Sequence, residues 1–230
     1  MAYPLETINL SKTYNTKYAV KNISFKLGLN EIIGILGPNG CGKTTTIGMI
    51  LGLLKPTKGK VLINGIEIES RRVDLLNELN FISPYIELPK KLTVKQNLEV
   101  YGRLYDVKKL KIKIDYLCEK LRLNEFINKI TGELSSGQKN RVSLAKSIIN
   151  DPTVLLLDEP TASLDPETGD FVRSFLEEYQ REKETSILLA SHNMSEVERL
   201  CSSVLMMNRG SIIDQGTTSE LISKHGRKNM

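Results

Sequence analysis

The stretch Gly37-Pro38-Asn39-Gly40-Cys41-Gly42-Lys43-Thr44-Thr45 decides the fold of this chain of 230 residues. It follows the apolar run Ile32–Leu36 and precedes the segment Thr46–Leu51, which has a helical pattern. A strand therefore leads into a glycine-rich loop, and a helix leaves it. In that context the pattern G-x-x-x-x-G-K-[ST] predicts a loop that binds phosphate groups. A glycine-rich turn that binds nothing is the alternative, and the complete motif disfavours it.

Each residue type in this loop has a chemical reason. Gly37, Gly40 and Gly42 permit backbone conformations that side chains forbid, so successive N–H groups can face one set of phosphate oxygens. A helix that starts near Gly42 adds the positive end of its dipole. Lys43 can reach the outer phosphates, and the hydroxyl of Thr44 can bind a Mg²⁺ ion between them.

The composition is that of a globular protein with one large domain, or a domain with an inserted subdomain. No apolar run approaches the roughly 20 residues that span a bilayer, and Met1–Glu6 does not begin a secretory signal peptide. We therefore expect the chain in the cytosol unless a partner holds it at a membrane. Cys41, Cys118 and Cys201 are widely spaced, which predicts free thiols in a reducing compartment. Cys41 lies in the loop, where we expect thiol reagents to modify it.

The formal net charge of +5 is modest. A lysine-rich patch precedes a predicted helix, and solvation of that helix start is its simplest role. Contact with acidic lipid or nucleic acid is the alternative. The patch consists of Lys108, Lys109, Lys111 and Lys113.

Two strands are predicted before the loop, over Leu5–Leu10 and Ala19–Leu27. A polar turn between them, Lys12–Asn15, carries Tyr14. An aromatic ring in a turn usually covers packed side chains. Because a phosphate loop follows about two dozen residues later, stacking on a purine is a second interpretation, worth roughly 1–3 kcal/mol per base.

After the loop helix, the sequence pattern changes from that of a strand to that of helices. Gly59–Gly65 is predicted to be a strand that ends in an Asn-Gly hairpin turn. From Pro84 to Asn150 the pattern is mainly helical, and Thr93 is predicted to cap a helix over Val94–Tyr105. This pattern predicts an all-α insertion in an α/β core. Its next apolar face is predicted to contain Ile112, Tyr116, Leu117 and Leu121.

The α/β core is predicted to resume at Val154–Leu157. This run is apolar at every position, which is typical of a parallel strand covered on both faces. Asp158 and Glu159 follow at its C-terminal end, where open α/β sheets place their ligands. The remaining predicted elements are a helix over Thr168–Glu182, strands over Ser186–Ala190 and Val204–Met207, and a hairpin at Arg209-Gly210.

Three further stretches occur in a specific order after the phosphate loop: Leu134–Gln138, Ala162–Asp165 and Ser191-His192. With Asp158-Glu159 they closely resemble the nucleotide-binding subunit of ATP-binding cassette (ABC) transporters, from Leu5 to about Leu221. The resemblance implies a P-loop NTPase core of α/β class with a mainly parallel sheet, an N-terminal antiparallel β subdomain and an inserted all-α subdomain. It implies one ABC ATPase domain, with the core in residues 1–83 and 151–223, the helical subdomain in 84–150 and a tail in 224–230.

The resemblance also implies roles for single residues. Glu159 corresponds to the general base that activates water, and Asp158 with Thr44 to the residues that bind Mg²⁺. His192 corresponds to the histidine that senses the γ-phosphate, and Tyr14 to the ring that stacks on adenine. Taken alone, Glu159 has a structural alternative, which is to cap the turn at Pro160. For His192 the alternative is a core histidine. The surrounding motifs favour the functional roles. Lys43 is counted as catalytic, and ATP contacts are implied for Gly37, Pro38, Asn39, Gly40, Cys41, Gly42, Lys43, Thr44 and Thr45.

Residues 135–138 match the family's signature motif, which binds the ATP held by the opposite subunit. This motif comprises Ser135, Ser136, Gly137 and Gln138. Asp165 matches the aspartate that crosses the dimer interface. Two half-sites on one chain imply a homodimer or heterodimer, closed head to tail around two Mg-ATP and opened after hydrolysis.

The family resemblance implies an ATPase coupled to transport, with transmembrane permease subunits as partners. The helix after the loop and the segment Asn97–Tyr105 look most like exporters of the drug and polysaccharide type. The implied location is peripheral, on the cytoplasmic face of the inner membrane. No specific nucleic-acid partner is expected.

Two positions depart from the family pattern. Ser136 stands where glycine is usual, and its hydroxymethyl group alters the predicted phosphate cradle. In the segment Phe81–Tyr85, Pro84 occupies the position of the Q-loop glutamine, and the next glutamine is Gln96. Pro84 has no amide side chain to contact Mg²⁺ or water. We assign that role to no other residue.

Two alternative functions remain from the sequence. A soluble cassette ATPase acting on ribosomes or nucleic acid generally carries two cassettes or a long coiled-coil insertion, and neither is present here. A nucleotide-binding regulator without turnover would not need Lys43, Asp158, Glu159 and His192 together.

Overall fold

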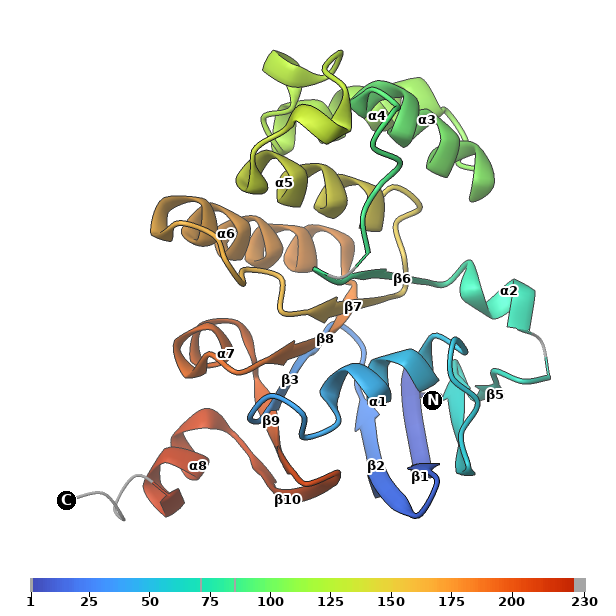
Figure 1. The fold of residues 1–230 in the computed structure, drawn as a ribbon, viewed down its shortest axis with the longest axis vertical. Coiled ribbons are helices and arrows are strands. Elements are labelled where there is room, and N and C mark those ends of the chain that lie inside the picture. The colour runs from blue at the N-terminus through green and yellow to red at the C-terminus, as the bar shows by residue number, and fades with distance from the viewer. Residues whose placement is uncertain (1, 71, 85, 226–230) are drawn as a thin grey trace.

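The structure is a computed structural model that describes residues 2–70, 72–84 and 86–225. Within these ranges the chain forms two sheets with helices packed on them (Figure 1). Of the segments predicted from sequence, Met1, Tyr85 and the tail from residue 226 lie outside the described residues. The helices are α1 (Lys43–Ile50), α2 (Arg72–Leu76), α3 (Val94–Leu104), α4 (Leu110–Lys120), α5 (Ser136–Ser147), α6 (Pro166–Lys183), α7 (Met194–Leu200) and α8 (Thr218–His225), with short 3-10 turns at Asn124–Phe126 and Thr131–Glu133.

The larger sheet has the strand order β10-β9-β3-β8-β7-β6, and every pair is parallel except β9 with the edge strand β10. Its strands are β3 (Ile32–Leu36), β6 (Leu79–Ile82), β7 (Val154–Asp158), β8 (Ser186–Ser191), β9 (Ser203–Asn208) and β10 (Ser211–Gly216). The parallel strands all direct their carboxyl ends to one edge of the sheet. The loop after β3 and the residues after β7 and β8 therefore meet at that edge.

The strand β7 is buried along its whole length. Leu155 and Leu157 contact a core cluster that includes side chains of α5 and α6, whereas Val154 and Leu156 belong to a second cluster that includes α1. Because alternate side chains of a strand point to opposite faces, an unbroken apolar run is required where both faces are covered. The prediction of a doubly covered central strand is confirmed.

The smaller sheet is antiparallel, in the order β2-β1-β4-β5. Its strands are β1 (Leu5–Tyr14), β2 (Lys17–Leu27), β4 (Lys58–Ile63) and β5 (Ile66–Glu67). Asn64 and Gly65 both have positive φ, 50° and 79°, as a two-residue hairpin turn requires. The predicted polar turn over residues 12–15 is wrong in part. Its first three residues extend β1 and pair with β2, so the turn falls at Asn15 and Thr16.

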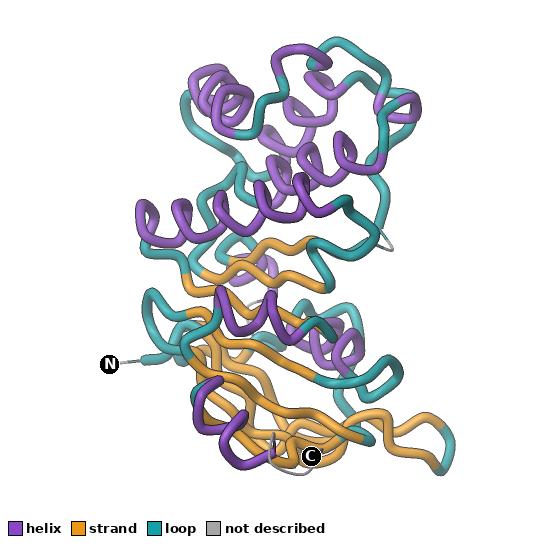
Figure 2. The backbone as a smooth tube through the Cα atoms, turned by 90° about the vertical axis from the view of Figure 1, so that its left-hand side faces the viewer, coloured by secondary structure: helices purple, strands orange, loops and turns teal. Residues whose placement is uncertain are grey.

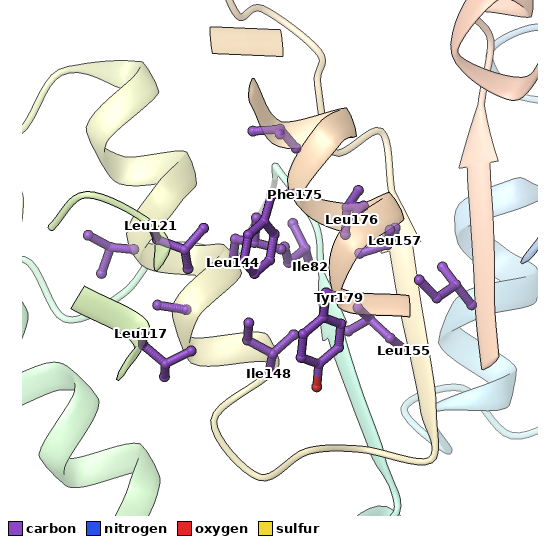
Figure 3. Packing of buried hydrophobic residues seen from close by; sticks show 14 of the residues in the cluster. Ile82, Leu117, Leu121, Leu144, Ile148, Leu155, Leu157, Phe175, Leu176 and Tyr179 are labelled. Atoms are coloured by element: carbon purple, nitrogen blue, oxygen red, sulfur yellow. The ribbon is translucent and has the colours of Figure 1, made fainter. Parts of the chain in front are cut away.

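The helical segment lies above the larger sheet and shares a core with it (Figures 1 and 2). Figure 3 shows Leu144 of α5, with Ile148 directly after that helix, against Phe175 and Tyr179 of α6. Leu117 of α4 and Leu121, directly after α4, lie on the other side of α5. The segment is therefore packed directly on the core. The boundaries 84–150 stay a prediction.

One predicted core residue of this segment is wrong. Ile112 is 65 % exposed, while Ile114, Leu117 and Cys118 form the buried face of α4. The helix begins at Leu110, after Lys109 in a left-handed conformation, and this start fixes which positions face inward. The spacing of apolar residues in the sequence did not determine which face of α4 is buried.

The fold class is confirmed: an α/β chain with an antiparallel sheet and a mostly parallel sheet. Four short elements, α2, β6, α7 and α8, were not predicted, because four to eight residues give too little periodicity to recognise. Across the described ranges, no helix combines the length and apolarity needed to cross a membrane.

Candidate functional site

The loop between β3 and α1 is shaped by glycines for two different reasons. Gly40 and Gly42 have φ of 79° and 113°, which side chains disfavour, and a Cβ on Gly42 would lie 2.6 Å from the carbonyl oxygen of Ala19. Gly37 differs from the prediction because its φ is not positive. Its Cβ would instead lie 2.3 Å from the carbonyl oxygen of Met207, so close packing on β9 requires glycine there.

Lys43 is the first residue of α1, and its side chain is buried at 6 % exposure. Its ammonium donates to the carbonyl oxygens of Gly37 at 2.6 Å and Pro38 at 3.4 Å, which curls the side chain back over the loop. The same nitrogen lies 3.5 Å from Glu159 Oε1. A buried ammonium group that donates to loop carbonyls can instead bind the oxygens of an anionic ligand.

Asp158 ends β7 and is 1 % exposed. Its Oδ2 accepts a hydrogen bond of 2.9 Å from the hydroxyl of Thr44, and its Oδ1 is buried without a hydrogen-bond partner. Burial raises the pKa of this carboxyl group, and the hydrogen bond from Thr44 opposes that rise. An unpaired carboxylate oxygen beside a hydroxyl is the donor set that Mg²⁺ binds, and the two residues fit that ion.

Glu159 lies one residue beyond Asp158 and turns the chain sharply. Its φ is 52°, a strained value for a residue with a long side chain, and its N–H donates to the carbonyl of Ala190 at 2.9 Å. Its Oε2 lies 2.8 Å from Nδ1 of His192, while Oε1 makes no hydrogen bond. One carboxylate oxygen is thus held by the imidazole, and the other lies buried beside the ammonium of Lys43. A carboxylate held in this way can accept a proton from water that enters the site.

His192 follows β8 and is 54 % exposed on its side chain. Nδ1 faces Glu159, which directs the other ring nitrogen away from that carboxylate. The exposure excludes the alternative that His192 is a buried core histidine. Lys43, Asp158, Glu159 and His192 come from three separate parts of the sequence, and the sheet edge brings them together.

Several residues of the predicted loop serve its own structure. Pro38 accepts a hydrogen bond from the N–H of Cys41 at 3.2 Å, while Asn39 is exposed and Thr45 half-buried. Cys41 is only 4 % exposed, and its carbonyl accepts from the N–H of Gly210. The expectation that thiol reagents reach Cys41 is not supported, because its thiol packs into the core beneath the loop.

Tyr14 lies at the end of β1 with 49 % of its surface exposed, and the ammonium of Lys12 lies 5.3 Å from its ring centre. The partner strand β2 contacts the phosphate loop through Ala19, beside Gly42. The hairpin that carries Tyr14 therefore borders the loop. An aromatic ring that is half exposed can stack on a planar group.

The turn at residues 135–138 begins α5 and forms a complete capping box. Ser135 Oγ accepts from the N–H of Gln138 at 3.3 Å, and Gln138 Oε1 accepts from the N–H of Ser135 at 3.0 Å. Ser136 is exposed, and a Cβ on Gly137 would lie 3.3 Å from Thr168 of α6. Side chains of α5 and of α1 belong to different core clusters, on opposite faces of the larger sheet. The helices that follow the two phosphate-binding candidates therefore pack on opposite faces of the larger sheet.

Asp165 is exposed and caps α6. Its Oδ1 accepts from the N–H of Thr168 at 2.9 Å, and this hydrogen bond lowers the pKa of the carboxyl group. The predicted start of this helix was two residues late, because Asp165 and Pro166 together begin it.

Pro84 lines a pocket of about 210 Å³ between the helical segment and the sheet edge that carries Glu159. Ser136, Asn140 and Glu159 line the same pocket, and Oδ1 of Asn140 is buried without a hydrogen-bond partner. A side chain longer than proline at position 84 would extend toward a space that Glu159 also borders.

Two residues that contact this edge, the half-buried Thr161 and the buried Glu196, were not identified from the sequence. Glu196 is 2 % exposed and accepts hydrogen bonds from Thr161 and Ser191. The spacing of Asn193 and Glu196 is the usual signal of a helix start, and it would have predicted α7. The contact to Thr161 has no sequence signal, because 35 residues separate the two.

Comparisons with known proteins give consistent results. Residues 20–162 match a family model described as "ABC transporter". The chain is 34 % identical over 206 residues to the ABC transporter ATP-binding protein NatA of Bacillus subtilis, covering 88 % of this chain and 83 % of that protein. It is 35 % identical over 218 residues to the Nod factor export ATP-binding protein I of Rhizobium etli, covering 94 % and 69 %.

Solved structures resemble the chain over nearly its whole length. The cbiO1 protein of Clostridium perfringens, part of the ABC transporter complex cbiONQ, superposes with a TM-score of 0.84 at 30 % identity, covering 97 % of this chain and 92 % of that one. The ATP-binding cassette MJ0796, a dimer in a post-hydrolysis state bound to ADP and Pi, gives 0.84 at 25 % identity and coverage of 93 % and 98 %.

Proposed function

This chain belongs to the ABC transporter family and is an ATP-binding subunit with ATPase activity, and on that premise we propose that it powers a membrane exporter. It acts as a dimer that closes around two Mg-ATP and opens after hydrolysis. Its partners are transmembrane permease subunits, and it is peripheral on the cytoplasmic face of the inner membrane. The arrangement of Lys43, Asp158, Glu159 and His192 at one sheet edge carries this proposal.

The export direction is supported by relatives. Proteins named for Nod factor export are 34–36 % identical to this chain over 94–96 % of its length. The proposal leaves the transported molecule to the permease. We expect the permease to determine which molecule is transported. The polar site of this chain is assigned to the phosphates of ATP.

Hydrolysis is assigned to residues already in contact. Lys43 holds the β- and γ-phosphates of ATP, in place of the loop carbonyls to which its ammonium now donates. Glu159 accepts a proton from a water molecule whose oxygen attacks the γ-phosphorus, and the bond from that phosphorus to the bridging oxygen breaks. His192 holds Glu159 Oε2 in place during this step. Tyr14 stacks on the adenine.

Thr44 and Asp158 are the proposed Mg²⁺ site. The unpartnered Oδ1 of Asp158 and the neighbouring hydroxyl fit that ion. When bound, Mg²⁺ neutralises charge on the outer phosphates.

The proposed dimer is supported by a solved relative, the cassette MJ0796, which is a dimer. It is also supported by the placement of α1 and α5 in different core clusters of one chain, on opposite faces of the larger sheet. In the proposed dimer, a second chain brings its turn 135–138 to the nucleotide held by the loop of the first. A two-fold axis then forms two equal sites, with Ser135, Ser136, Gly137 and Gln138 of one protomer facing the loop of the other. Asp165 lies at the start of α6, next to that turn, where it crosses the interface.

The proposal is tested by finding the membrane partner. Tagged protein is purified from detergent-solubilised membranes of the native cell, and the co-purified subunits are identified by mass spectrometry. We expect a permease with membrane-spanning helices in stoichiometric amount, and ATP hydrolysis that increases when the complex is reconstituted. Recovery with ribosomes instead, without a membrane subunit, would overturn the transport function.

His192→Ala is expected to lower kcat for ATP hydrolysis by about 10- to 100-fold, because loss of the 2.8 Å contact leaves Glu159 free to move from its productive position. ATP affinity should remain within about threefold, since His192 binds the base more than the nucleotide. Steady-state kinetics with an enzyme-coupled phosphate assay gives both numbers. Unchanged kcat would show that His192 has no part in turnover.

Pro84→Gln is expected to increase the ATPase rate or its dependence on Mg²⁺ concentration. An amide at this position extends into the pocket shared with Glu159, where it can contact Mg²⁺ or water. The measurement is the ATPase rate over a Mg²⁺ titration, with Pro84→Ala as the control that removes the ring without adding an amide. Equal curves for both variants and the wild type would show that position 84 is unimportant here.

A further inference from the structure

Glu196 is a buried carboxylate with both oxygens occupied. It lies on α7 at 2 % exposure, its Oε1 accepts from the hydroxyl of Thr161 at 2.6 Å, and its Oε2 accepts from the hydroxyl of Ser191 at 2.7 Å. These are the short distances of hydrogen bonds to a charged acceptor. A carboxylate that loses such partners in a buried position becomes strongly destabilising.

The two donors belong to the segments that carry the proposed base and histidine. Thr161 is two residues after Glu159, and Ser191 directly precedes His192. Glu196 therefore connects these two segments through its hydrogen bonds to Thr161 and Ser191. The contact between Glu159 and His192 connects the same segments a second time. Neither connection uses a residue of the phosphate loop.

The position of Glu196 is itself fixed. Asn193 Oδ1 accepts from the backbone N–H groups of Ser195 at 3.0 Å and Glu196 at 3.4 Å, and the N–H of Asn193 donates to Ser191 Oγ at 3.0 Å. Ser191 Oγ thus accepts one hydrogen bond and donates another. Each hydroxyl and each carboxylate oxygen in the network has a partner, so the network holds one geometry.

The segment around Thr161 has further hydrogen bonds: the N–H of Glu159 donates to the carbonyl of Ala190 at 2.9 Å, and the carbonyl of Pro160 accepts from the side-chain amide of Asn140 at 2.7 Å. Glu159 has a strained φ of 52°, and the turn after it is closed by Ala162 N–H to the carbonyl of Glu159 at 3.1 Å and by Leu164 N–H to the carbonyl of Thr161 at 3.3 Å. Strained backbone persists where surrounding contacts determine it. The Thr161–Glu196 hydrogen bond is a further long-range contact, and it can help to hold the strained backbone at Glu159.

We propose that Glu196 is a positioning residue for ATP hydrolysis, which through Thr161 and Ser191 holds Glu159 and His192 at the separation that catalysis needs. This inference rests on the proposed function, in which Glu159 accepts the proton from water. It differs from a purely stabilising role, because it predicts a specific loss of kcat that depends on the presence of Glu159.

The primary test compares two substitutions of Thr161. Thr161→Val keeps the shape and removes the hydroxyl, whereas Thr161→Ser keeps the hydroxyl and serves as the matched control. We expect Thr161→Val to lower kcat by about 10- to 100-fold with KM for ATP within about threefold. Thr161→Ser should restore kcat to within about threefold of the wild type. Rates are expressed per nucleotide-binding site, titrated with a fluorescent ATP analogue, so that a partly unfolded sample does not count as a slow enzyme.

A second substitution reaches the network from the other side. Ser191→Ala removes the hydrogen bond to Glu196 Oε2 and is expected to lower kcat in the same way, even if Thr161→Val folds poorly. The same changes are then made in the Glu159→Gln background, where single-turnover hydrolysis is followed over hours. Without the base to position, neither change should reduce the remaining rate by more than about threefold.

The outcomes separate this inference from the proposed function. A kcat within about threefold of the wild type in either folded variant would overturn the positioning role. So would losses that are equally large with and without Glu159, since they would reflect stability alone. If the wild-type protein binds ATP but fails to hydrolyse it even with its membrane partner, the proposed function is overturned first, and the positioning role with it.

Discussion

Glu159→Gln is expected to lower ATP hydrolysis by about 10²–10⁴-fold while ATP still binds with nearly unchanged affinity. The amide has the size of the carboxylate but accepts no proton. Its oxygen and nitrogen can still occupy the positions beside Lys43 and His192, at 3.5 Å and 2.8 Å in the wild type. The substitution therefore removes proton transfer and leaves the site assembled.

The same substitution should trap a closed dimer. If loss of the γ-phosphate opens the dimer, a protein that binds Mg-ATP without hydrolysing it remains in the closed state. Size-exclusion chromatography with light scattering is expected to give twice the chain mass of 25.9 kDa with Mg-ATP, and the monomer mass with Mg-ADP. Removal of Mg²⁺ with EDTA should also return the monomer, which tests the proposed ion at Thr44 and Asp158.

The matched control is Glu119→Gln, which neutralises an exposed carboxylate on α4. It should hydrolyse ATP at the wild-type rate and show no trapped dimer. A monomeric elution profile of Glu159→Gln at saturating Mg-ATP would count heavily against the head-to-tail dimer. Wild-type turnover by that variant would remove Glu159 from the proposed mechanism.

Lys43→Ala is expected to weaken ATP binding by about 100-fold or more. A hydrogen bond to a charged group contributes roughly 1.5–3 kcal/mol, and each 1.4 kcal/mol is about tenfold in affinity. Lys43 is buried and lies beside Glu159, so its removal also leaves a carboxylate near the phosphates without its neighbouring cation. Both effects act in the same direction.

Isothermal titration calorimetry with ATP measures this change. Lys108→Ala is the control, because Lys108 is 82 % exposed and pairs with Asp106 at the surface. It should bind ATP as the wild type does. Circular dichroism of Lys43→Ala checks that the loop, which now lacks the hydrogen bonds to Gly37 and Pro38, still supports a folded chain. Unchanged affinity in a folded Lys43→Ala protein would contradict the assignment of residues 37–45 as the phosphate-binding loop.

The fold could be predicted where the sequence encodes it locally. The strand before the loop, the apolar run 154–157 and the Asn64-Gly65 turn each have a pattern with one structural solution, and all three were predicted and are present. The family and its ATPase activity were also predicted from the order of short motifs, and the comparisons confirm them. The roles of the single site residues stay predictions.

The predictions of burial and of secondary structure were wrong where contacts between distant parts of the chain decide them. The rotation of α4 exposes Ile112 because packing against α3 and α5 selects another face of the helix. Lys12, Thr13 and Tyr14 look like a turn by composition, yet pairing with β2 extends the strand through them. The predicted lysine patch is also not uniform. Lys113 is half-buried and pairs with Asp151 at 2.6 Å, while Lys108 is exposed. Burial lowers the pKa of Lys113, and its pairing with Asp151 opposes this.

The sequence by itself determined the phosphate loop, the central strand and the family, because these depend on residue types at short, fixed spacings. Only the tertiary structure decided that Gly37 is needed for its packing on β9, that Cys41 is buried, and that Glu196 joins Thr161 to Ser191. Glu196 lies 35 positions from Thr161, and Gly37 lies 170 positions (207 − 37) from Met207, whose carbonyl oxygen a Cβ at position 37 would meet. Their physical basis is the packing of strands and helices around a shared core, which no local pattern specifies.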